Sequence, residues 1–164
     1  MPLHRHRPAR YLRPQRVSGF VTHMPAALHE ARAAAARGEV PVGAVVVSPR
    51  GEVLAAAGNE TRAARDPTAH AEVLAIRRAC AALGDERLTG CALWVTLEPC
   101  AMCAGAIVHA RLAALHFAAL DPKGGGVDHG ARVLATAMHA PEIYRGAGEA
   151  EAADLLRAFF AARR

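Results

Sequence analysis

The 164-residue sequence predicts an α/β domain whose sheet contains parallel strands, and two observations lead to this fold class. Strand-like runs of apolar residues alternate along the chain with helical patterns, which is the order expected for such a sheet. One of these runs, residues 91–97, is almost continuously apolar, as in a strand that is buried on both faces. Because 52% of the residues are hydrophobic, the chain can bury one sizeable core.

The positive charge of the chain is concentrated near its N-terminus. The formal net charge is +5, but residues 1–22 contain five arginines and no acidic residue, so residues 23–164 hold equal numbers of basic and acidic residues. We therefore expect a basic, disordered extension over residues 1–22 and one domain over residues 23–164. An organelle transit peptide or a start at Met24 is the alternative for the extension. Any contact of the domain with nucleic acid must come from a local basic patch.

The sequence predicts a soluble, cytoplasmic protein with reduced thiols. His109, Arg111 and His116 interrupt the longest apolar stretch, so no segment reaches the roughly 20 apolar residues of a membrane span. The N-terminal residues lack the apolar run of a secretory signal, and the four cysteines are unevenly spaced.

The first predicted elements are a helix and a hairpin. Apolar residues at helical spacing begin at Met24, and Arg37-Gly38 provides a C-terminal stop for that helix. Two short β-type runs follow, Val42–Val47 and Glu52–Ala57, and the proline and glycine between them favour a tight turn.

Helices and strands then alternate to the C-terminus. Asp66 followed by Pro67 is typical of a helix start, which predicts a helix over Pro67–Leu83. The remaining predicted elements are a strand over Cys91–Leu97, a helix opened by Pro99, a strand over Leu112–Leu120, a loop over Asp121–Gly126 and a last helix over Glu149–Arg163.

Three candidate zinc ligands stand near the starts of the predicted helices. Cys100 and Cys103 are three residues apart, so both thiolates can face one ion, and the positive helix N-terminus favours their ionised form. His70 precedes them by about the length of one helix and one strand. One histidine and two cysteines leave the fourth tetrahedral position open, which is typical of a catalytic zinc.

Glu72 is the candidate general acid and base. It follows His70 by two residues, so it does not share a helix face with that ligand and is a poor co-ligand. A carboxylate beside the ion can instead take a proton from the activated water and pass it on.

Taken singly, each motif has a simpler interpretation. A C-x-x-C pair also occurs in redox proteins and closed structural zinc sites, and a lone histidine is usually a packed or exposed side chain. A zinc-stabilised RNA-binding module without catalysis would need a fourth ligand, which folding could supply from Cys80, Cys91 or His109. We expect Cys80, Cys91 and Trp94 to be core residues instead.

The sequence resembles the zinc-dependent nucleobase and nucleoside deaminases, which share H-x-E and P-C-x-x-C motifs. Within them it is most similar to the bacterial tRNA-specific adenosine deaminases, from about Met24 to the C-terminus. The matching stretches are Gly38–Ala44, Gly58-Asn59, Asp66–Glu72, Thr96–Ala106, Asp121–Lys123, Phe159-Phe160 and Arg163-Arg164. Ala118 and Ala161 depart from the residues usual there, a glycine and a basic residue.

This resemblance implies hydrolytic deamination of the wobble adenosine of a tRNA anticodon to inosine. It assigns His70, Cys100 and Cys103 to one zinc ion per subunit and Glu72 to proton transfer, in a homodimer without membrane attachment. It implies a three-layer α/β/α sandwich around a five-stranded mixed sheet. The substrate-binding residues that it implies are Asn59 at the base, Glu39 and Val42 in the pocket, and Asp121 and Lys123 at the anticodon stem-loop.

The alternative with the same chemistry is a deaminase of guanine or another small nucleobase. It would have much the same Asp66–Glu72 stretch. The loop Asp121–Lys123 and the C-terminal Phe159–Arg164 segment favour the tRNA enzyme.

Overall fold

The computed structural model describes residues 21–164, so the basic extension expected over residues 1–22 lies outside the described residues except for its last two. The chain forms the elements α1 (Met24–Ala36), β1 (Gly43–Val47), β2 (Val53–Gly58), α2 (Thr61–Ala64), α3 (Ala71–Leu83), β3 (Ala92–Leu97), α4 (Ala101–His109), β4 (Ala114–Ala119), α5 (Val133–Thr136), β5 (Glu142–Arg145) and α6 (Glu149–Ala161).

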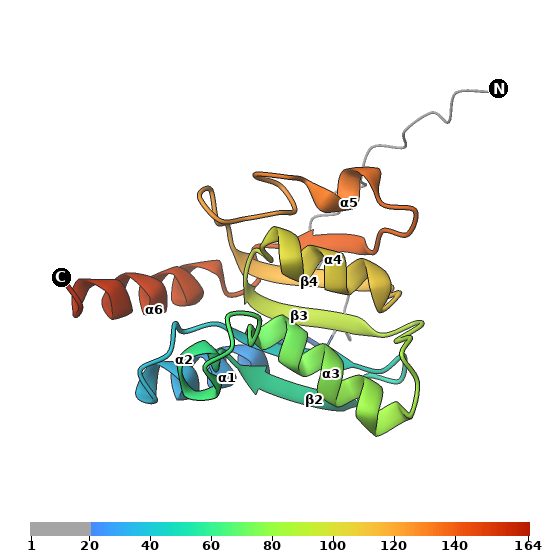
Figure 1. The fold of residues 1–164 in the computed structure, drawn as a ribbon, viewed down its shortest axis with the longest axis horizontal. Helices are drawn as coiled ribbons and strands as arrows, with labels where there is room; N and C mark the ends of the chain where they lie inside the picture. The colour runs from blue at the N-terminus through green and yellow to red at the C-terminus, as the bar shows by residue number, and fades with distance from the viewer. Residues whose placement is uncertain (1–20) are drawn as a thin grey trace.

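The strands form one five-stranded mixed sheet in the order β2-β1-β3-β4-β5 (Figure 1). Strand β1 pairs antiparallel with both β2 and β3, whereas β3, β4 and β5 are parallel to one another. The predicted α/β class and the five-stranded mixed sheet are thus confirmed. In this topology the carboxyl ends of β2, β3 and β4 lie at the same end of the strands as the start of β1. The segments that follow β2, β3 and β4 and the segment that precedes β1 therefore lie close together.

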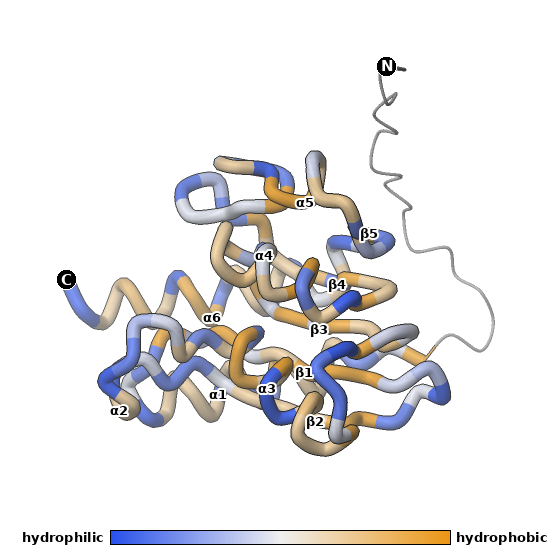
Figure 2. The backbone as a smooth tube through the Cα atoms, turned by 45° about the vertical axis from the view of Figure 1, so that its right-hand side comes forward, coloured by the Kyte–Doolittle hydropathy of each residue, from blue (hydrophilic) through white to orange (hydrophobic). Residues whose placement is uncertain are grey.

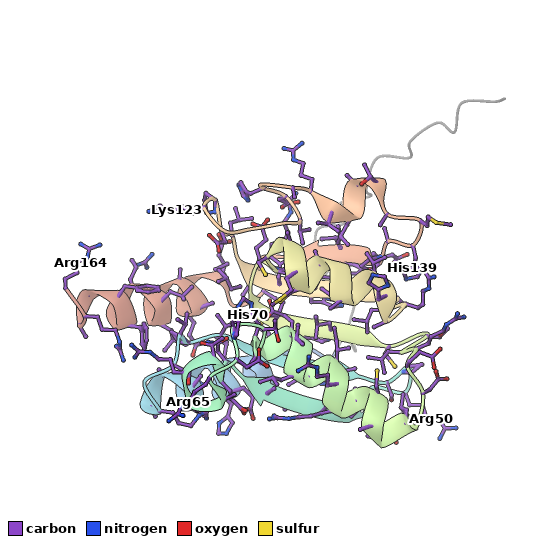
Figure 3. All side chains as sticks on the ribbon, in the orientation of Figure 1. Arg50, Arg65, His70, Lys123, His139 and Arg164 are labelled. Carbon is purple, nitrogen blue, oxygen red and sulfur yellow. The ribbon has the colours of Figure 1, made fainter. Side chains whose placement is uncertain are left out.

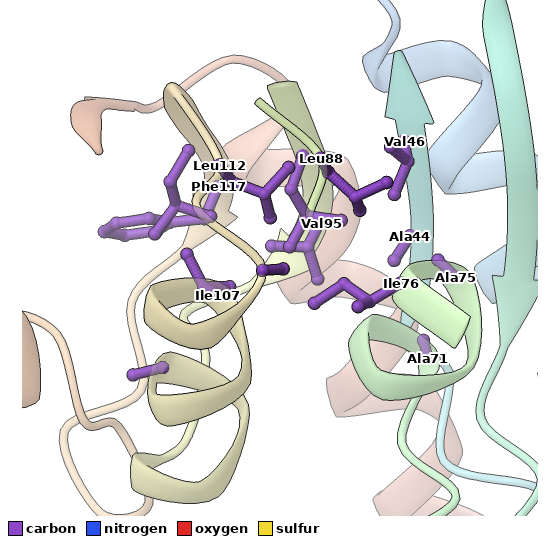
Figure 4. Packing of buried hydrophobic residues seen from close by; sticks show 14 of the residues in the cluster. Ala44, Val46, Ala71, Ala75, Ile76, Leu88, Val95, Ile107, Leu112 and Phe117 are labelled. Carbon is purple, nitrogen blue, oxygen red and sulfur yellow. The ribbon is translucent and has the colours of Figure 1, made fainter. Parts of the chain in front are cut away.

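Helices cover both faces of the sheet, and the alternation of β1 shows why. Ala44 and Val46 point to the core cluster beneath α3 and α4, whereas Val45 and Val47 point to the cluster beneath α1 and α6. All five residues of β1 are buried, as in a central strand covered on both sides. Figure 4 shows the first cluster, in which Ile76 of α3 and Ile107 of α4 pack toward the strands. The three-layer α/β/α sandwich is confirmed.

Three of the predicted helix boundaries differ from the observed ones. Asp66 does not cap a helix that begins at Pro67, because its Oδ1 accepts hydrogen bonds from the Thr68 N–H and hydroxyl and closes a separate turn. Helix α3 begins only at Ala71, with His70 in an extended conformation as its N-cap. Helix α4 likewise begins at Ala101 rather than at Pro99, with Cys100 as its N-cap. The last helix ends at Ala161 rather than at Arg163.

When the backbone is coloured by residue hydropathy, hydrophobic residues lie along the strands, whereas the C-terminal end of the chain is hydrophilic (Figure 2). Cys91 and Trp94 are buried as expected, with 2% and 3% of their surface exposed, whereas Cys80 is only partly buried. Within residues 21–164, no helix combines the length and the apolar character that a membrane span requires.

Candidate active site

Every residue that the sequence singles out for chemistry belongs to a segment at the carboxyl edge of the parallel strands. Glu39 and Val42 precede β1, Asn59 directly follows β2, and His70 and Glu72 open α3. Cys100 follows β3, and Asp121 and Lys123 follow β4. Clefts at the carboxyl ends of parallel strands are the usual ligand sites of open α/β sheets. Figure 3 shows His70 near the middle of the molecule, with Lys123 and Arg65 to its left and Arg50 and His139 at the right-hand end.

His70 is placed by a loop that folds back on itself. The Glu60 N–H donates to the Ala69 carbonyl and the His70 N–H donates to the Thr68 carbonyl. The two ends of the segment 60–70, which connects β2 to α3, are thus hydrogen-bonded to each other. His70 is the N-cap of α3 and has an extended backbone conformation, so it stands before the first helical turn rather than within it.

The cysteines are placed by the turn from β3 into α4. Pro99 separates the strand from the helix, Cys100 is the N-cap of α4 and Cys103 lies in its first turn. The Gly126 N–H donates to the Pro99 carbonyl at 2.8 Å, which ties this turn to the loop that follows β4.

His70, Cys100 and Cys103 form a cluster whose spacing fits one metal ion. His70 Nδ1 lies 3.5 Å from Cys103 Sγ and 3.7 Å from Cys100 Sγ, and the three ligand atoms lie within 4.8 Å of one another. A tetrahedral zinc ion with bonds of about 2.3 Å to sulfur and about 2.0 Å to nitrogen needs such ligand atoms roughly 3.6 Å apart. Among the described residues, no other group of potential ligands is this close.

The two thiols have opposite proton affinities. The hydrogen bond with Cys103, and then the contact with His70, lowers the pKa of the Cys100 thiol to about 4. The same hydrogen bond, together with burial, raises the pKa of the Cys103 thiol far above its usual value. Cys100 is thus the thiol that ionises first, and a cation bound between the two sulfur atoms would favour ionisation of both.

Glu72 is buried beside this cluster without belonging to it. Only 4% of its surface is exposed, and this burial raises the pKa of its carboxyl to about 7. Its own backbone N–H and the Cys103 thiol oppose that rise through hydrogen bonds. A carboxyl with this pKa both takes and gives a proton near neutral pH, which is what a general acid and base requires.

The three residues expected at the base and in the pocket are held differently from one another. The Glu39 carboxylate is buried and accepts hydrogen bonds from the backbone N–H groups of Arg62 and Ala63, which open α2. Asn59 Nδ2 donates to Thr61 Oγ1 at 3.3 Å. Val42 lies in the core cluster with 8% of its surface exposed. Glu39 therefore organises the α2 loop beside the site, a role that its residue type alone does not indicate.

Sequence reasoning missed one residue of this region, Glu98. It is 2% exposed and accepts hydrogen bonds from the loop that follows β4. Burial alone would raise the pKa of this carboxyl, but these hydrogen bonds outweigh burial and hold the pKa below its usual value. The signal was an acidic residue placed directly after the buried strand β3, where an unpaired charge would be costly.

Comparison with known proteins places the chain in a family. The model of the MafB19-like deaminase family matches residues 21–164. The tRNA-specific adenosine deaminase of Agrobacterium fabrum is 54% identical over 146 residues, which cover 87% of this chain and 95% of the relative. This chain belongs to the tRNA-specific adenosine deaminases. As a member of that family it is an enzyme of the deaminase class.

Solved structures agree with the membership in the tRNA-specific adenosine deaminases. A structure from work on A-to-I editing by tRNA:A34 deaminases at the wobble position matches with a TM-score of 0.79 at 54% identity, covering 81% of this chain and 97% of its own. A guanine deaminase from Nitrosomonas europaea matches with a TM-score of 0.75 at 27% identity, covering 84% and 82%. The fold is therefore shared with small-nucleobase deaminases, whereas the sequence is much closer to the tRNA enzyme.

Proposed function

We propose that this deaminase converts the adenosine at the wobble position, position 34, of a tRNA anticodon to inosine, with water as the second substrate and ammonia as the second product. The observation that carries the proposal is the pairing of a buried carboxyl, Glu72, whose pKa is about 7, with a histidine and two cysteines at metal-ligand spacing. The relative at 54% identity supports tRNA as the substrate class.

His70, Cys100 and Cys103 would hold one zinc ion per subunit. When bound, the ion would supply Lewis-acid activation of the attacking water. Two thiolates and one imidazole would supply three ligands to that ion, and three protein ligands are typical of a zinc that keeps a position open for water.

Glu72 moves the protons of the reaction. Its carboxylate accepts a proton from the water as the oxygen attacks C6 of the purine, and it delivers that proton to N1. It then carries the second proton of the water to the departing amine, so that ammonia leaves and the C6 carbonyl of inosine forms. Because Glu72 is buried, the bulk solvent cannot replace it as a proton carrier.

Substrate recognition is assigned to the loops around the site. Asn59 would contact the flipped base, Glu39 and Val42 would shape the pocket, and Asp121 and Lys123 would contact the anticodon stem-loop. At the C-terminus, the Arg163 Nη1–H donates to the Phe159 carbonyl and its guanidinium lies 3.4 Å from the centre of the Phe159 ring, which orients this cation. Flipping a loop adenosine costs only a few kcal/mol because it is already partly unstacked.

The assembly and the cellular setting are also proposals. Met102, Leu120 and Phe160 are exposed large hydrophobic side chains, which supports a homodimer whose partner subunit would cover such surface. We place the enzyme in the cytoplasm, where its tRNA substrate would be, with residues 23–164 as its single domain and the basic residues 1–22 as an extension.

A deamination assay on two stem-loops and three free compounds tests the function. We expect the purified protein to form inosine in an anticodon stem-loop that carries adenosine at position 34, detected by nucleoside chromatography, and to leave a stem-loop with guanosine there unchanged. Free adenosine, cytidine and guanine should be turned over poorly. Efficient conversion of free guanine to xanthine without inosine in the stem-loop would make the alternative, a small-nucleobase deaminase, correct.

A further inference from the structure

The loop that follows β4, which we call the 121–129 loop, is hydrogen-bonded to Glu98 at both of its ends. Glu98 Oε2 accepts hydrogen bonds from the Asp121 N–H at 2.9 Å and from His129 Nδ1 at 2.7 Å. Its Oε1 accepts the N–H groups of Val127, Asp128 and His129 at 3.3, 2.9 and 3.0 Å. One buried carboxylate thus accepts five hydrogen bonds from a single loop, and its own N–H donates to the Ala119 carbonyl at 2.8 Å.

Two glycines let this loop press directly on Glu98 and on the start of α4. A Cβ at Gly125 would lie 2.4 Å from Glu98 Oε1. A Cβ at Gly126 would lie 2.4 Å from the Ala101 nitrogen and 2.7 Å from the Cys100 carbonyl carbon. A side chain at position 125 would therefore collide with Glu98, and one at position 126 with the backbone at the start of α4. The position of the loop is therefore set by the same turn that sets the candidate metal ligands.

The outer part of the loop presents one cation. Asp121 Oδ1 accepts the N–H groups of Lys123 and Gly124, at 3.2 and 2.9 Å, and so holds the turn in shape. Lys123 is exposed at the tip of this turn and is the only lysine of the chain. An exposed ammonium on a turn whose backbone is hydrogen-bonded to Asp121 is suited to a phosphate group of a nucleic acid.

A second contact anchors the far end of the loop. Arg145 Nη1, at the end of β5, lies 2.6 Å from Asp128 Oδ2, and the side chain of Asp128 is 9% exposed. The loop is thus tied to β3 through Glu98 and to β5 through Arg145, while Lys123 is left free of both anchors.

We propose that Glu98 is a positioning residue for substrate binding, which holds the 121–129 loop against α4 so that Lys123 contacts the RNA backbone beside the reacting adenosine. The proposal rests on the proposed function, since it assumes an RNA substrate. Glu98 touches neither substrate nor metal in this role. It determines where a cation stands relative to the site, which affects KM for the stem-loop more than kcat.

A double-mutant cycle between Glu98 and Lys123 tests this role. We expect Lys123→Ala and Glu98→Gln each to raise KM for the adenosine-34 stem-loop by about tenfold, because each removes or displaces one phosphate contact. The kcat should change less than about threefold, and the metal content per chain should stay at the wild-type value. In the double variant the two effects should not multiply, because Glu98 acts through Lys123.

Two further variants separate positioning from folding. His129→Ala removes one donor to Glu98 from a partly exposed side chain, and it should give a smaller rise in KM that also vanishes in the Lys123→Ala background. The His129→Ala variant takes the place of Glu98→Gln in the cycle if Glu98→Gln does not fold. His139→Ala is the matched control, because His139 Nε2 bonds the Leu112 carbonyl at 2.7 Å at the other end of β4. This control should leave KM unchanged.

Several results would overturn the positioning role. They are a full multiplication of the two effects, an effect confined to kcat with loss of metal, and a Lys123→Ala variant with wild-type KM. A wild-type enzyme that forms no inosine in the stem-loop would instead overturn the proposed function, and this inference with it.

Discussion

Each face of the sheet buries a titratable group, Glu72 on one face and His116 on the other, and burial has a different consequence for each. On the face of α3 and α4, burial raises the pKa of Glu72 to about 7, beside the candidate metal ligands. On the face of α1 and α6, burial lowers the pKa of His116 to about 4, and a charge on nearby His23 adds to that shift. His116 is stacked between Trp94 and Tyr144, with ring centroids 3.7 and 4.6 Å away.

The comparison shows that burial alone does not make a catalytic group. In both places it favours the neutral form, as burial does for any acid or base. Glu72 gains a pKa at which it exchanges protons near neutral pH, and it lies beside the candidate metal ligands. His116 is neutral throughout that range and packs as a third ring in an aromatic stack, so we expect it to contribute to packing.

The largest effect should come from Glu72→Gln. Glutamine has the shape of the protonated glutamic acid but cannot carry a proton, so we expect the rate on the stem-loop to fall about 10²–10⁴-fold. The thermal midpoint should be unchanged, because no buried charge is left unpaired, and metal analysis should still find one ion per chain. A variant with near-normal turnover would show that another group moves the proton and would break the contrast between the two faces.

Much of this site was predictable because its chemistry depends on residue type and spacing. The pairing of His70 with Cys100 and Cys103 follows from one helix plus one strand between two motifs, and the structure brings the three together. Glu98 and the role of Glu39 at α2 were not predictable, because their partners are backbone N–H groups of distant loops. Main-chain donors exist at almost every residue, so no pattern of side chains marks them.

The buried His116 should make the protein less stable at acidic pH. Its pKa is about 6.5 when unfolded and about 4 in the fold, so the unfolded chain binds the extra proton first as the pH falls. The contribution of His116 to the free energy of unfolding is therefore fully present above pH 6.5. It decreases by roughly 3 kcal/mol in total between pH 6.5 and 4. Urea unfolding at a series of pH values measures this slope.

His116→Phe is the matched control for that slope. Phenylalanine keeps a ring between Trp94 and Tyr144 but cannot be protonated, so the variant should lose stability less steeply over the same pH range. An unchanged slope would assign the acid sensitivity to other groups and leave His116 as a packing residue only.

The fold was predictable in its long elements and not in its short ones. Strand β3 is a nearly continuous apolar run and helix α1 has clear apolar periodicity, and the boundaries of both agree with the prediction within one or two residues. The four-residue elements α2, α5 and β5 were not predicted from periodicity, because so short a segment holds no repeat. The start of α3 was misplaced because Asp66 can cap a helix or close a turn, and the sequence does not distinguish the two.

Gly126→Ala should lower stability by about 1–3 kcal/mol. The added methyl group would lie within 2.6 Å of both the nitrogen and the Cα of Ala101, which are backbone atoms that cannot rotate away. The 121–129 loop would have to move off the start of α4, so KM for the stem-loop should rise as well. Urea unfolding and initial rates check the two effects, and wild-type values for both would show that the close approach at this face is not needed.

The smallest effect should have the opposite sign and come from Gly105→Ala, in the same helix. Gly105 lies inside α4, and a Cβ built there meets nothing within 4 Å, in contrast to Gly126. Alanine loses less backbone freedom than glycine on folding, so this change should stabilise the protein by about 0.5–1 kcal/mol. The measurement is again urea unfolding, with the rate on the stem-loop unchanged. A loss of stability would mean that another surface covers this side of α4, and a fall in the apparent molecular mass of the variant would identify that surface as the partner subunit of the proposed homodimer.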